Sequence, residues 1–268
     1  MTAHRIDLTQ RVSKFVNQIA GLENAEGLPL WKGPVCPFVS GVTHQEGEFI
    51  RGRVSEIARK AGLPHAGEYC RPNLFILVSA DPKGLLQGWD DRNSMRRLVF
   101  GEATPFVTDE FIKTPRPVRV WYRTIMRTPE NTTPNQGLPP FSALVGVGGF
   151  AWGLKVNNDS ERTSHILLSK IWSFEDVFVI ADQARLRGMA LGQFADYVAV
   201  VGLAKLKPGA HLGDAPTILK LFDGAPEAAP AGLTDWDRAF LKSLYTTEQV
   251  SKQQRGQVAR QMVREISP

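Results

Sequence analysis

The sequence predicts a single water-soluble α/β (α+β) domain, with a mixed twisted sheet, a buried central helix and C-terminal helices. The first observation is a helix pattern followed by a continuous apolar run of strand length at 73–80 (NLFILVSA), typical of a strand buried on both faces. The second is another strand pattern at 116–126, opened by Pro117. The third is a segment of helical length at 189–205 that is apolar almost all round, as expected of a buried helix.

Composition favours an ordinary globular chain. Of the 268 residues, 43% are hydrophobic and 22% charged, which excludes fibrous and intrinsically disordered classes. We expect one domain over 1–268, with an N-terminal helix and connector in 1–32 and a Pro/Ala-rich loop at 223–232. No apolar run reaches 18 residues, so we expect no integral membrane segment. The first twenty residues lack a continuous apolar core, so we expect no signal peptide within this sequence.

The net charge of +5 and the pI of about 9.3 leave two interpretations open. One is a solvated basic surface without a specific partner. The other is attraction of anionic partners such as nucleic acid or acidic polymers.

The first half of the chain reads as helices around the strand at 73–80. Residues 7–20 have the apolar spacing of an amphipathic helix. A second helix carries Phe49 and Val54 on its apolar side and ends at Gly62. Residues 83–100 suggest one helix or two, interrupted by DDRNS.

The second half begins with the strand at 116–126 and a proline-rich loop at 129–140. The segments 165–172 and 176–182 read as two strands of a hairpin. After the buried helix and the 223–232 loop, Thr234 is placed to cap a helix that runs to Tyr245, and a charged helix covers about 248–266.

The two cysteines, Cys36 and Cys70, each lie beside a proline or one residue from it. An even count without metal-type spacing predicts a disulfide, which would indicate an oxidising compartment. The alternative is two buried free thiols in a cytoplasmic protein.

Asp196 is the only charged residue between Arg187 and Lys205. A buried carboxylate must be paired or protonated, because an unpaired buried charge costs several kcal/mol. We therefore predict that Asp196 is buried and hydrogen-bonded. It is either a structural ion pair or a catalytic general base with Tyr197 nearby.

The strand at 116–127 alternates basic and apolar residues. Strand side chains point alternately to opposite faces, so one face carries Arg119, Trp121, Arg123, Ile125 and Arg127. Guanidinium groups and an indole are suited to an anionic or sugar-bearing ligand, and we predict a partly open face with Arg119, Trp121, Arg123 and Arg127 as ligand-binding residues. The alternative is that helices cover this face and the arginine stems pack over Trp121. The opposite face, with Val118, Val120, Tyr122, Thr124 and Met126, is predicted to face the core.

No two of the five histidines are three or four residues apart, and the chain has no phosphate-binding loop, nucleophile elbow or C-x-x-C motif. We expect no metal site, no bound zinc and no other cofactor.

The closing segment LTDWDRAFLKSLY resembles the last helix of zincin-type metallopeptidases of the metzincin branch, of the form L-x-x-x-D-x-x-x-L-x-x-L-Y. The matching residues here are Leu233, Asp237, Leu241, Leu244 and Tyr245. The order of elements is also similar, and Gly202 can take the glycine position of the family's H-E-x-x-H-x-x-G-x-x-H helix.

In that register Asp196 takes the general-base position, and the three zinc-ligand positions fall on Ala195, Ala199 and Lys205. A second register gives Gln193 and Tyr197. Neither set can hold zinc as the family does, and APTIL at 215–219, in the place of the family's methionine turn, contains no methionine.

The chain further resembles uncharacterised exported zincin-like proteins of Gram-negative bacteria. The resemblance implies a periplasmic or secreted location, with a cytoplasmic one as the alternative. The function expected is a non-catalytic domain that binds a peptide, glycan or protein partner in the bacterial envelope. Two alternatives remain: a metal-independent hydrolase that uses Asp196, and an anion- or nucleic-acid-binding protein that uses the strand 116–127.

Overall fold

A computed structural model describes residues 3–21, 27–67, 69–127, 171–224, 228–247 and 253–267. These ranges contain the helices α1 (Ala3–Ile19), α2 (His44–Ala61), α3 (Pro82–Asp90), α4 (Asn93–Phe100), α5 (Pro105–Lys113), α6 (Leu191–Leu203), α7 (Asp235–Thr246) and α8 (Gln254–Ile266). They also contain two short 3₁₀ helices, η2 (Gln183–Leu186) and η3 (Ile218–Phe222). The strands are β1 (Pro37–Ser40), β2 (Leu74–Ser79), β3 (Val118–Arg127) and β4 (Ile171–Asp182). The predicted α/β class is confirmed.

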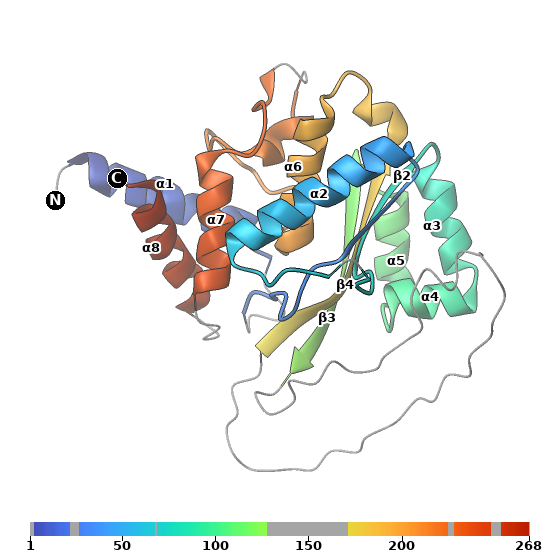
Figure 1. Cartoon of the computed structure of the whole chain (residues 1–268). Helices are drawn as coiled ribbons and strands as arrows, with labels where there is room; N and C mark the ends of the chain where they lie inside the picture. The colour runs from blue at the N-terminus through green and yellow to red at the C-terminus, as the bar shows by residue number, and fades with distance from the viewer. Residues whose placement is uncertain are drawn as a thin grey trace, which may run out of the picture.

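The four strands form one mixed sheet in the order β1-β2-β4-β3. β1, β2 and β4 are parallel to one another, and β3 pairs antiparallel with β4. Helices lie on both faces of the sheet, with α3, α4 and α5 on one side and α2, α6 and the remaining helices on the other (Figure 1). β3 is therefore an edge strand in the described part of the fold, and β1 is the other edge.

Local signals explain the first helix that packs on the sheet. Thr43 and Glu46 form a capping box at the start of α2, and Gly62 ends the helix with a positive φ of 105°, a conformation that favours glycine. Ile50, Val54 and Ile57 on its inner side are buried. The predicted helix that ends at Gly62 is confirmed, but Phe49, which was predicted on its apolar side, is 47% exposed.

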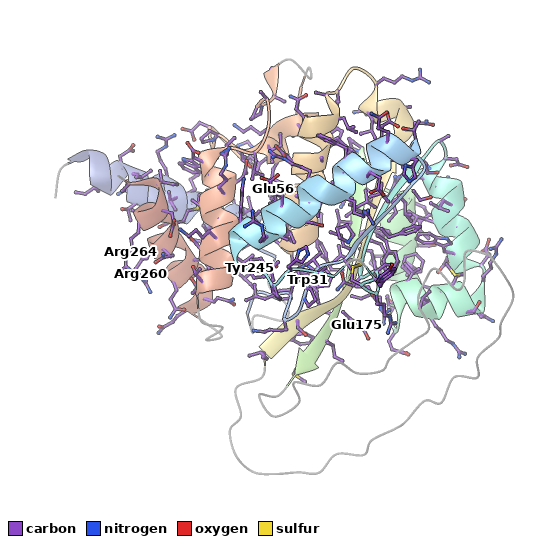
Figure 2. All side chains as sticks on the ribbon, in the orientation of Figure 1. Trp31, Glu56, Glu175, Tyr245, Arg260 and Arg264 are labelled. Atoms are coloured by element: carbon purple, nitrogen blue, oxygen red, sulfur yellow. A yellow bond between two sulfur atoms is a disulfide. The ribbon has the colours of Figure 1, made fainter. Side chains whose placement is uncertain are left out.

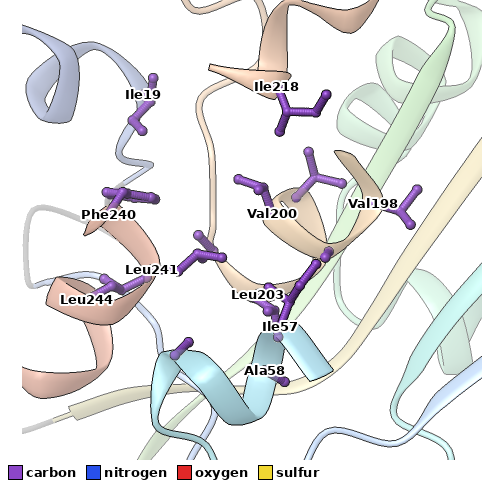
Figure 3. Packing of buried hydrophobic residues seen from close by; sticks show 14 of the residues in the cluster. Ile19, Ile57, Ala58, Val198, Val200, Leu203, Ile218, Phe240, Leu241 and Leu244 are labelled. Carbon is purple, nitrogen blue, oxygen red and sulfur yellow. The ribbon is translucent and has the colours of Figure 1, made fainter. Parts of the chain in front are cut away.

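The larger core surrounds α6, whose residues Phe194, Val198, Val200 and Leu203 are buried. Figure 3 shows this cluster, in which α6 lies between α2, α7 and the segment that carries Ile218. Gly202 lets α6 approach the sheet closely, because a Cβ there would lie 2.9 Å from the terminal carbons of Leu74. The predicted buried helix is confirmed, and its glycine has a packing role.

The predicted hairpin of 165–172 and 176–182 is wrong. β4 runs without a turn from Ile171 to Asp182, and 165–170 lie outside the described residues. The register with β3 shifts between Arg123 and Thr124, so that Asp176 and Phe174 are their respective partners and Glu175 is the extra residue of a β-bulge. The residues 173–175 that separated the two predicted strands lie inside β4, and Glu175 among them is the bulge residue.

Cys36 and Cys70 form the predicted disulfide, with their Cα atoms 5.9 Å apart. The bridge lies just before β1 and near the start of β2. The Asn73 side chain stabilises the same region: it accepts a hydrogen bond from the Cys36 amide at 2.8 Å and donates one to the Pro34 carbonyl at 3.0 Å. Within the described ranges no helix has the length and apolar character needed to cross a bilayer.

Candidate functional site

Asp196 lies on α6 and is buried, as predicted, with 1% of its surface exposed. Its carboxylate accepts hydrogen bonds from Arg53 of α2, at 2.6 Å from Nε and 3.1 Å from a terminal nitrogen, and from the Leu233 amide at 2.6 Å. A Cβ at Gly232 would lie 2.8 Å from the same carboxylate, so a larger residue there would force the carboxylate or the backbone to shift. The ion pair therefore joins α2, α6 and the segment that enters α7.

Asp196 and Tyr197 do not form a joint site. Successive residues of a helix point in different directions, and the Tyr197 ring packs edge-on against Phe222 of η3, with centroids 5.0 Å apart. Burial raises the pKa of Tyr197, which keeps its phenol protonated. The Asp196 carboxylate already accepts three hydrogen bonds, so this geometry supports the structural interpretation of Asp196 that the sequence left open.

The C-terminal end of α6 is held by three aromatic side chains. The last carbonyls of a helix lack partners within the helix. Here Trp31 donates to Gly202 at 3.0 Å, Tyr245 donates to Leu203, and the Tyr122 hydroxyl lies 2.9 Å from the Val201 carbonyl. Trp31 and Tyr245 are labelled in Figure 2. Tyr245, one of the residues on which the resemblance of the closing helix rests, thus anchors α7 to α6.

We expect Tyr245→Phe to lower the free energy of unfolding by about 1–2 kcal/mol, because it leaves the Leu203 carbonyl without its partner. Urea denaturation measures the change. Tyr197→Phe is the matched control, since the Tyr197 hydroxyl makes no hydrogen bond among the described residues, and it should be nearly neutral. Equal losses in the two variants would show that the hydrogen bond from Tyr245 to the Leu203 carbonyl contributes no stability of its own.

From Val118 to Tyr122 the faces of β3 alternate as predicted, but Met126, which was predicted to face the core, is 44% exposed. Val118, Val120 and Tyr122 pack against the core around α6. Trp121 points to the opposite side, where it contacts Phe100 of α4 and Phe111 of α5 with ring centroids 5.1 and 4.9 Å away.

The expectation of an open basic face is wrong at its centre, because α4 and α5 cover it. Arg119 is only 6% exposed, and burial lowers its pKa. Arg123 is paired with Glu175 at 2.6 Å and Asp176 at 2.8 Å on the bulge of β4. The Arg127 side chain lies outside the described residues.

The bulge also creates a pH-sensitive group. Burial, and to a lesser extent the neighbouring Glu175 charge, raise the pKa of Asp176 to about 6, although Arg123 opposes the shift. The pKa of an unperturbed aspartate is 3.8. Because the folded-state pKa is the higher one, the stability contributed by protonated Asp176 is present below pH 3.8 and is lost as the pH rises through about 6.

We therefore expect Asp176→Asn to stabilise the fold by about 1–3 kcal/mol at pH 8 and to have little effect at pH 4. The amide keeps an acceptor for Arg123 without the buried charge. Thermal denaturation of both proteins across this pH range measures the difference. If Asp176→Asn changed the stability of the fold by the same amount at pH 4 and at pH 8, the raised pKa of Asp176 would be contradicted.

The outer edge of β3 has main-chain groups without a described partner. The Asp182 amide donates to Pro117 at 2.9 Å, whereas the Val177 amide donates toward β2, to Asn73 at 2.9 Å. In an antiparallel pair, successive residues direct their main-chain groups alternately toward and away from the partner strand. The main-chain N–H and C=O groups of Arg119 and Trp121 therefore point to β4. Those of Val118, Val120 and Tyr122 point away from it. In the described ranges, no main-chain hydrogen bond satisfies these outward groups.

Cavities lie on both sides of this edge. One, of about 300 Å³, lies on the α6 side; apolar side chains such as Val120, Leu219 and Phe222 line it together with Tyr197 and the charged residues Lys207 and Asp223. The other, of about 420 Å³, lies on the α5 side and is lined by Val107, Glu110, Phe111, Trp121 and Lys205. Both include Arg116, Val120, Tyr122 and Pro208. We call the two cavities together the β3 edge groove.

The sequence did not single out three residues that matter here. Arg53, the partner of Asp196, lies 143 positions away from it in the sequence. The sequence pattern shows Arg53 only as a basic residue next to the apolar side of α2, which does not indicate a buried partner. Arg116 was noted only as the start of a strand and Lys205 only as a ligand position that cannot bind zinc. Arg116 and Lys205 lie beside the outer edge of β3. That position depends on the order of the strands in the sheet, which no local sequence pattern encodes.

No group of three or more His, Cys, Asp or Glu side chains is arranged to hold a metal ion in the part of the chain that the structure describes. Two of the zinc-ligand positions implied by the resemblance, Ala195 and Ala199, are fully buried in the core around α6. No protein-family model, curated protein or solved structure matches this chain.

Proposed function

We propose that this chain is a non-catalytic, zincin-like binding domain of the bacterial envelope, and that it takes up an extended peptide along the outer edge of β3. The observation that carries the proposal is the β3 edge groove: an edge strand whose outward main-chain groups lack described partners, with a cavity on each side. A peptide that adds to a sheet edge gains affinity from main-chain hydrogen bonds and specificity from pockets for its alternate side chains.

Two further features support the proposal. The Cys36–Cys70 disulfide is typical of proteins in oxidising compartments, which supports an envelope location. The zinc-ligand positions of the resembled peptidases are occupied by Ala195, Ala199 and Lys205, which supports binding without metal-dependent hydrolysis.

Two exposed apolar side chains of α5, Phe106 and Val107, lie beside the β3 edge groove. Phe106 is 77% and Val107 45% exposed, and Val107 also lines the cavity on that side. Exposed apolar side chains next to an unpaired strand edge are suited to cover a bound peptide.

Hydrogen exchange tests the proposal. The probe is a library of proline-free octapeptides with alternating β-branched and polar residues, titrated into the full chain. We expect at least one peptide to slow exchange of the Val120 and Tyr122 amides, while the Arg119 and Trp121 amides, already bonded to β4, change little. If no peptide protects Val120 and Tyr122, the proposal fails. Protection that rises with protein concentration in the absence of peptide would assign the edge to a second copy of the chain and would also overturn it.

A matched pair of variants isolates the main-chain contribution. Val120→Pro removes one outward N–H, at a site where an edge strand tolerates proline, and Val120→Thr keeps the N–H with a similar shape. We expect Val120→Pro to weaken binding about five- to ten-fold and Val120→Thr to bind as wild type does. Equal affinities of the two variants would contradict strand addition.

A further inference from the structure

The cavity on the α6 side of the β3 edge groove has room for one large side chain. Its volume is about 300 Å³, at the lower end of the range of about 300–1,000 Å³ that small-molecule sites have. Apolar side chains from β3, from the segment after α6 and from η3 form most of its wall: Val118, Val120, Leu206, Leu212, Leu219 and Phe222. An apolar group of a bound peptide would therefore be removed from water here.

Three charged residues also line this cavity. Lys207 and Asp223 are exposed, and Arg116 is half-buried. The Lys207 amine donates to the Asn17 carbonyl at 2.8 Å, in the last turn of α1. Because the three charges are of both signs and two of them are exposed to water, which weakens ionic interactions, they do not define a site for a charged side chain.

Tyr197 brings a polar group without a partner to the cavity. Its ring packs edge-on against Phe222, with centroids 5.0 Å apart, and both residues line the cavity. The Tyr197 hydroxyl makes no hydrogen bond among the described residues, whereas the Tyr122 hydroxyl has partners at the end of α6. Burial, and to a lesser extent the Asp223 charge, raise the pKa of Tyr197. The phenol therefore stays protonated and can both donate and accept a hydrogen bond.

A peptide added to β3 would bring side chains to this hydroxyl. Successive side chains of a strand point alternately to the two sides of the sheet, so every second one points to the α6 side. An aromatic ring is suited to pack beside the rings of Tyr197 and Phe222, since such rings attract one another edge to face. A tyrosine also supplies a hydroxyl that pairs with Tyr197 in either direction. A phenylalanine would cover the Tyr197 hydroxyl and leave it unpaired, which is unfavourable.

We infer that the cavity on the α6 side of the β3 edge groove receives a tyrosine side chain of the bound peptide, with its ring beside Phe222 and its hydroxyl hydrogen-bonded to Tyr197. The inference rests on the proposed function, because it needs a peptide added to β3. It narrows the ligand to extended peptides that present a tyrosine to the α6 side of the sheet.

Three octapeptides that differ in one residue test the inference with the wild-type chain. They share one alternating, proline-free frame and carry tyrosine, phenylalanine or alanine at a central position. We expect the tyrosine peptide to bind about five-fold more tightly than the phenylalanine peptide, because it adds one hydrogen bond. The phenylalanine peptide should bind at least about ten-fold more tightly than the alanine peptide, because its ring buries more apolar surface. Equal affinities of the tyrosine and phenylalanine peptides would contradict the inference.

The variant Tyr197→Phe completes a double-mutant cycle with these peptides. The preference for tyrosine over phenylalanine should disappear in this variant, whereas the preference for phenylalanine over alanine should remain. Tyr245→Phe is the matched control, because it removes a hydroxyl from a residue that lines neither cavity. A five-fold preference for tyrosine that survives Tyr197→Phe would overturn the assigned hydrogen bond.

Two variants that fill the cavities locate the bound side chain. Ala210 lines the cavity on the α6 side and Ala103 the cavity on the α5 side, and both are half-buried. We expect Ala210→Leu to reduce the affinity ratio of the tyrosine and alanine peptides about ten-fold, and Ala103→Leu to leave the ratio unchanged. If Ala103→Leu reduced the ratio and Ala210→Leu did not, the tyrosine would lie on the α5 side and the inference would be wrong.

Hydrogen exchange separates this inference from the proposed function. If all three peptides bind wild type equally and protect the Val120 and Tyr122 amides, strand addition stands and the tyrosine site is refuted. If none of them and no library member protects those amides, the proposed function itself fails, and the inference fails with it.

Discussion

Replacing Cys36 and Cys70 by serine is expected to lower the free energy of unfolding by about 3–4 kcal/mol. The bridge joins residues separated by 34 positions, and in the chain-entropy account it stabilises mainly by restricting the unfolded chain. The loop that it closes contains β1 and the whole of α2. Loss of the bridge should therefore affect the unit of β1, α2 and β2 first.

Urea denaturation of the double serine variant, beside wild type with and without a reducing agent, measures this effect. Reduced wild type should match the variant, because both lack the same covalent link. A loss below about 1 kcal/mol in both would show that packing of α2 on the sheet fixes the start of β1 without the bridge. The double variant should still form the β3 edge groove, since neither cysteine lines it.

Arg53→Met is expected to lower the free energy of unfolding by about 2–4 kcal/mol. The substitution leaves the Asp196 carboxylate buried with only the Leu233 amide as a partner, and an uncompensated buried charge is strongly unfavourable. Arg53 itself is 34% exposed at its side chain, so solvent moderates the loss. Asp196→Ala should cost less, about 1–3 kcal/mol, because the freed arginine can turn to water or to Glu56.

A double-mutant cycle tests whether the two side chains act as a pair. The double variant Arg53→Met with Asp196→Leu should lose less than the sum of the single changes, since it strands neither charge. Glu56→Gln is the control, because it removes only the surface ion pairs of Glu56 with Arg53, at 3.4 Å, and with Lys60, at 2.6 Å. It should change stability by no more than about 0.5 kcal/mol. Additive losses in the cycle would contradict the pairing.

The sequence alone determined the α/β class and several elements, because their signals are local. The cap residues and apolar spacing of α2, the continuous apolar run of β2 and the composition of α6 each depend on residues that lie within one turn or one strand of one another. The same local reasoning identified Asp196 as buried, since a single carboxylate in an apolar helix has few alternatives. It also paired Cys36 with Cys70, because the chain contains only two cysteines.

Only the tertiary structure decided what surrounds these elements. Period-two alternation correctly divided the faces of β3 from Val118 to Tyr122, but it could not show that Met126 is exposed, that Arg119 is buried or that α4 and α5 cover Trp121. It could not show either that β3 lies at the edge of the sheet. Asp196 meets Arg53 across 143 residues, and β4, which is continuous and carries a bulge at Glu175, was predicted as two strands. The physical reason is that strand order and layer packing arise from contacts between distant segments, whereas a sequence pattern reports only the preferences of its own neighbourhood.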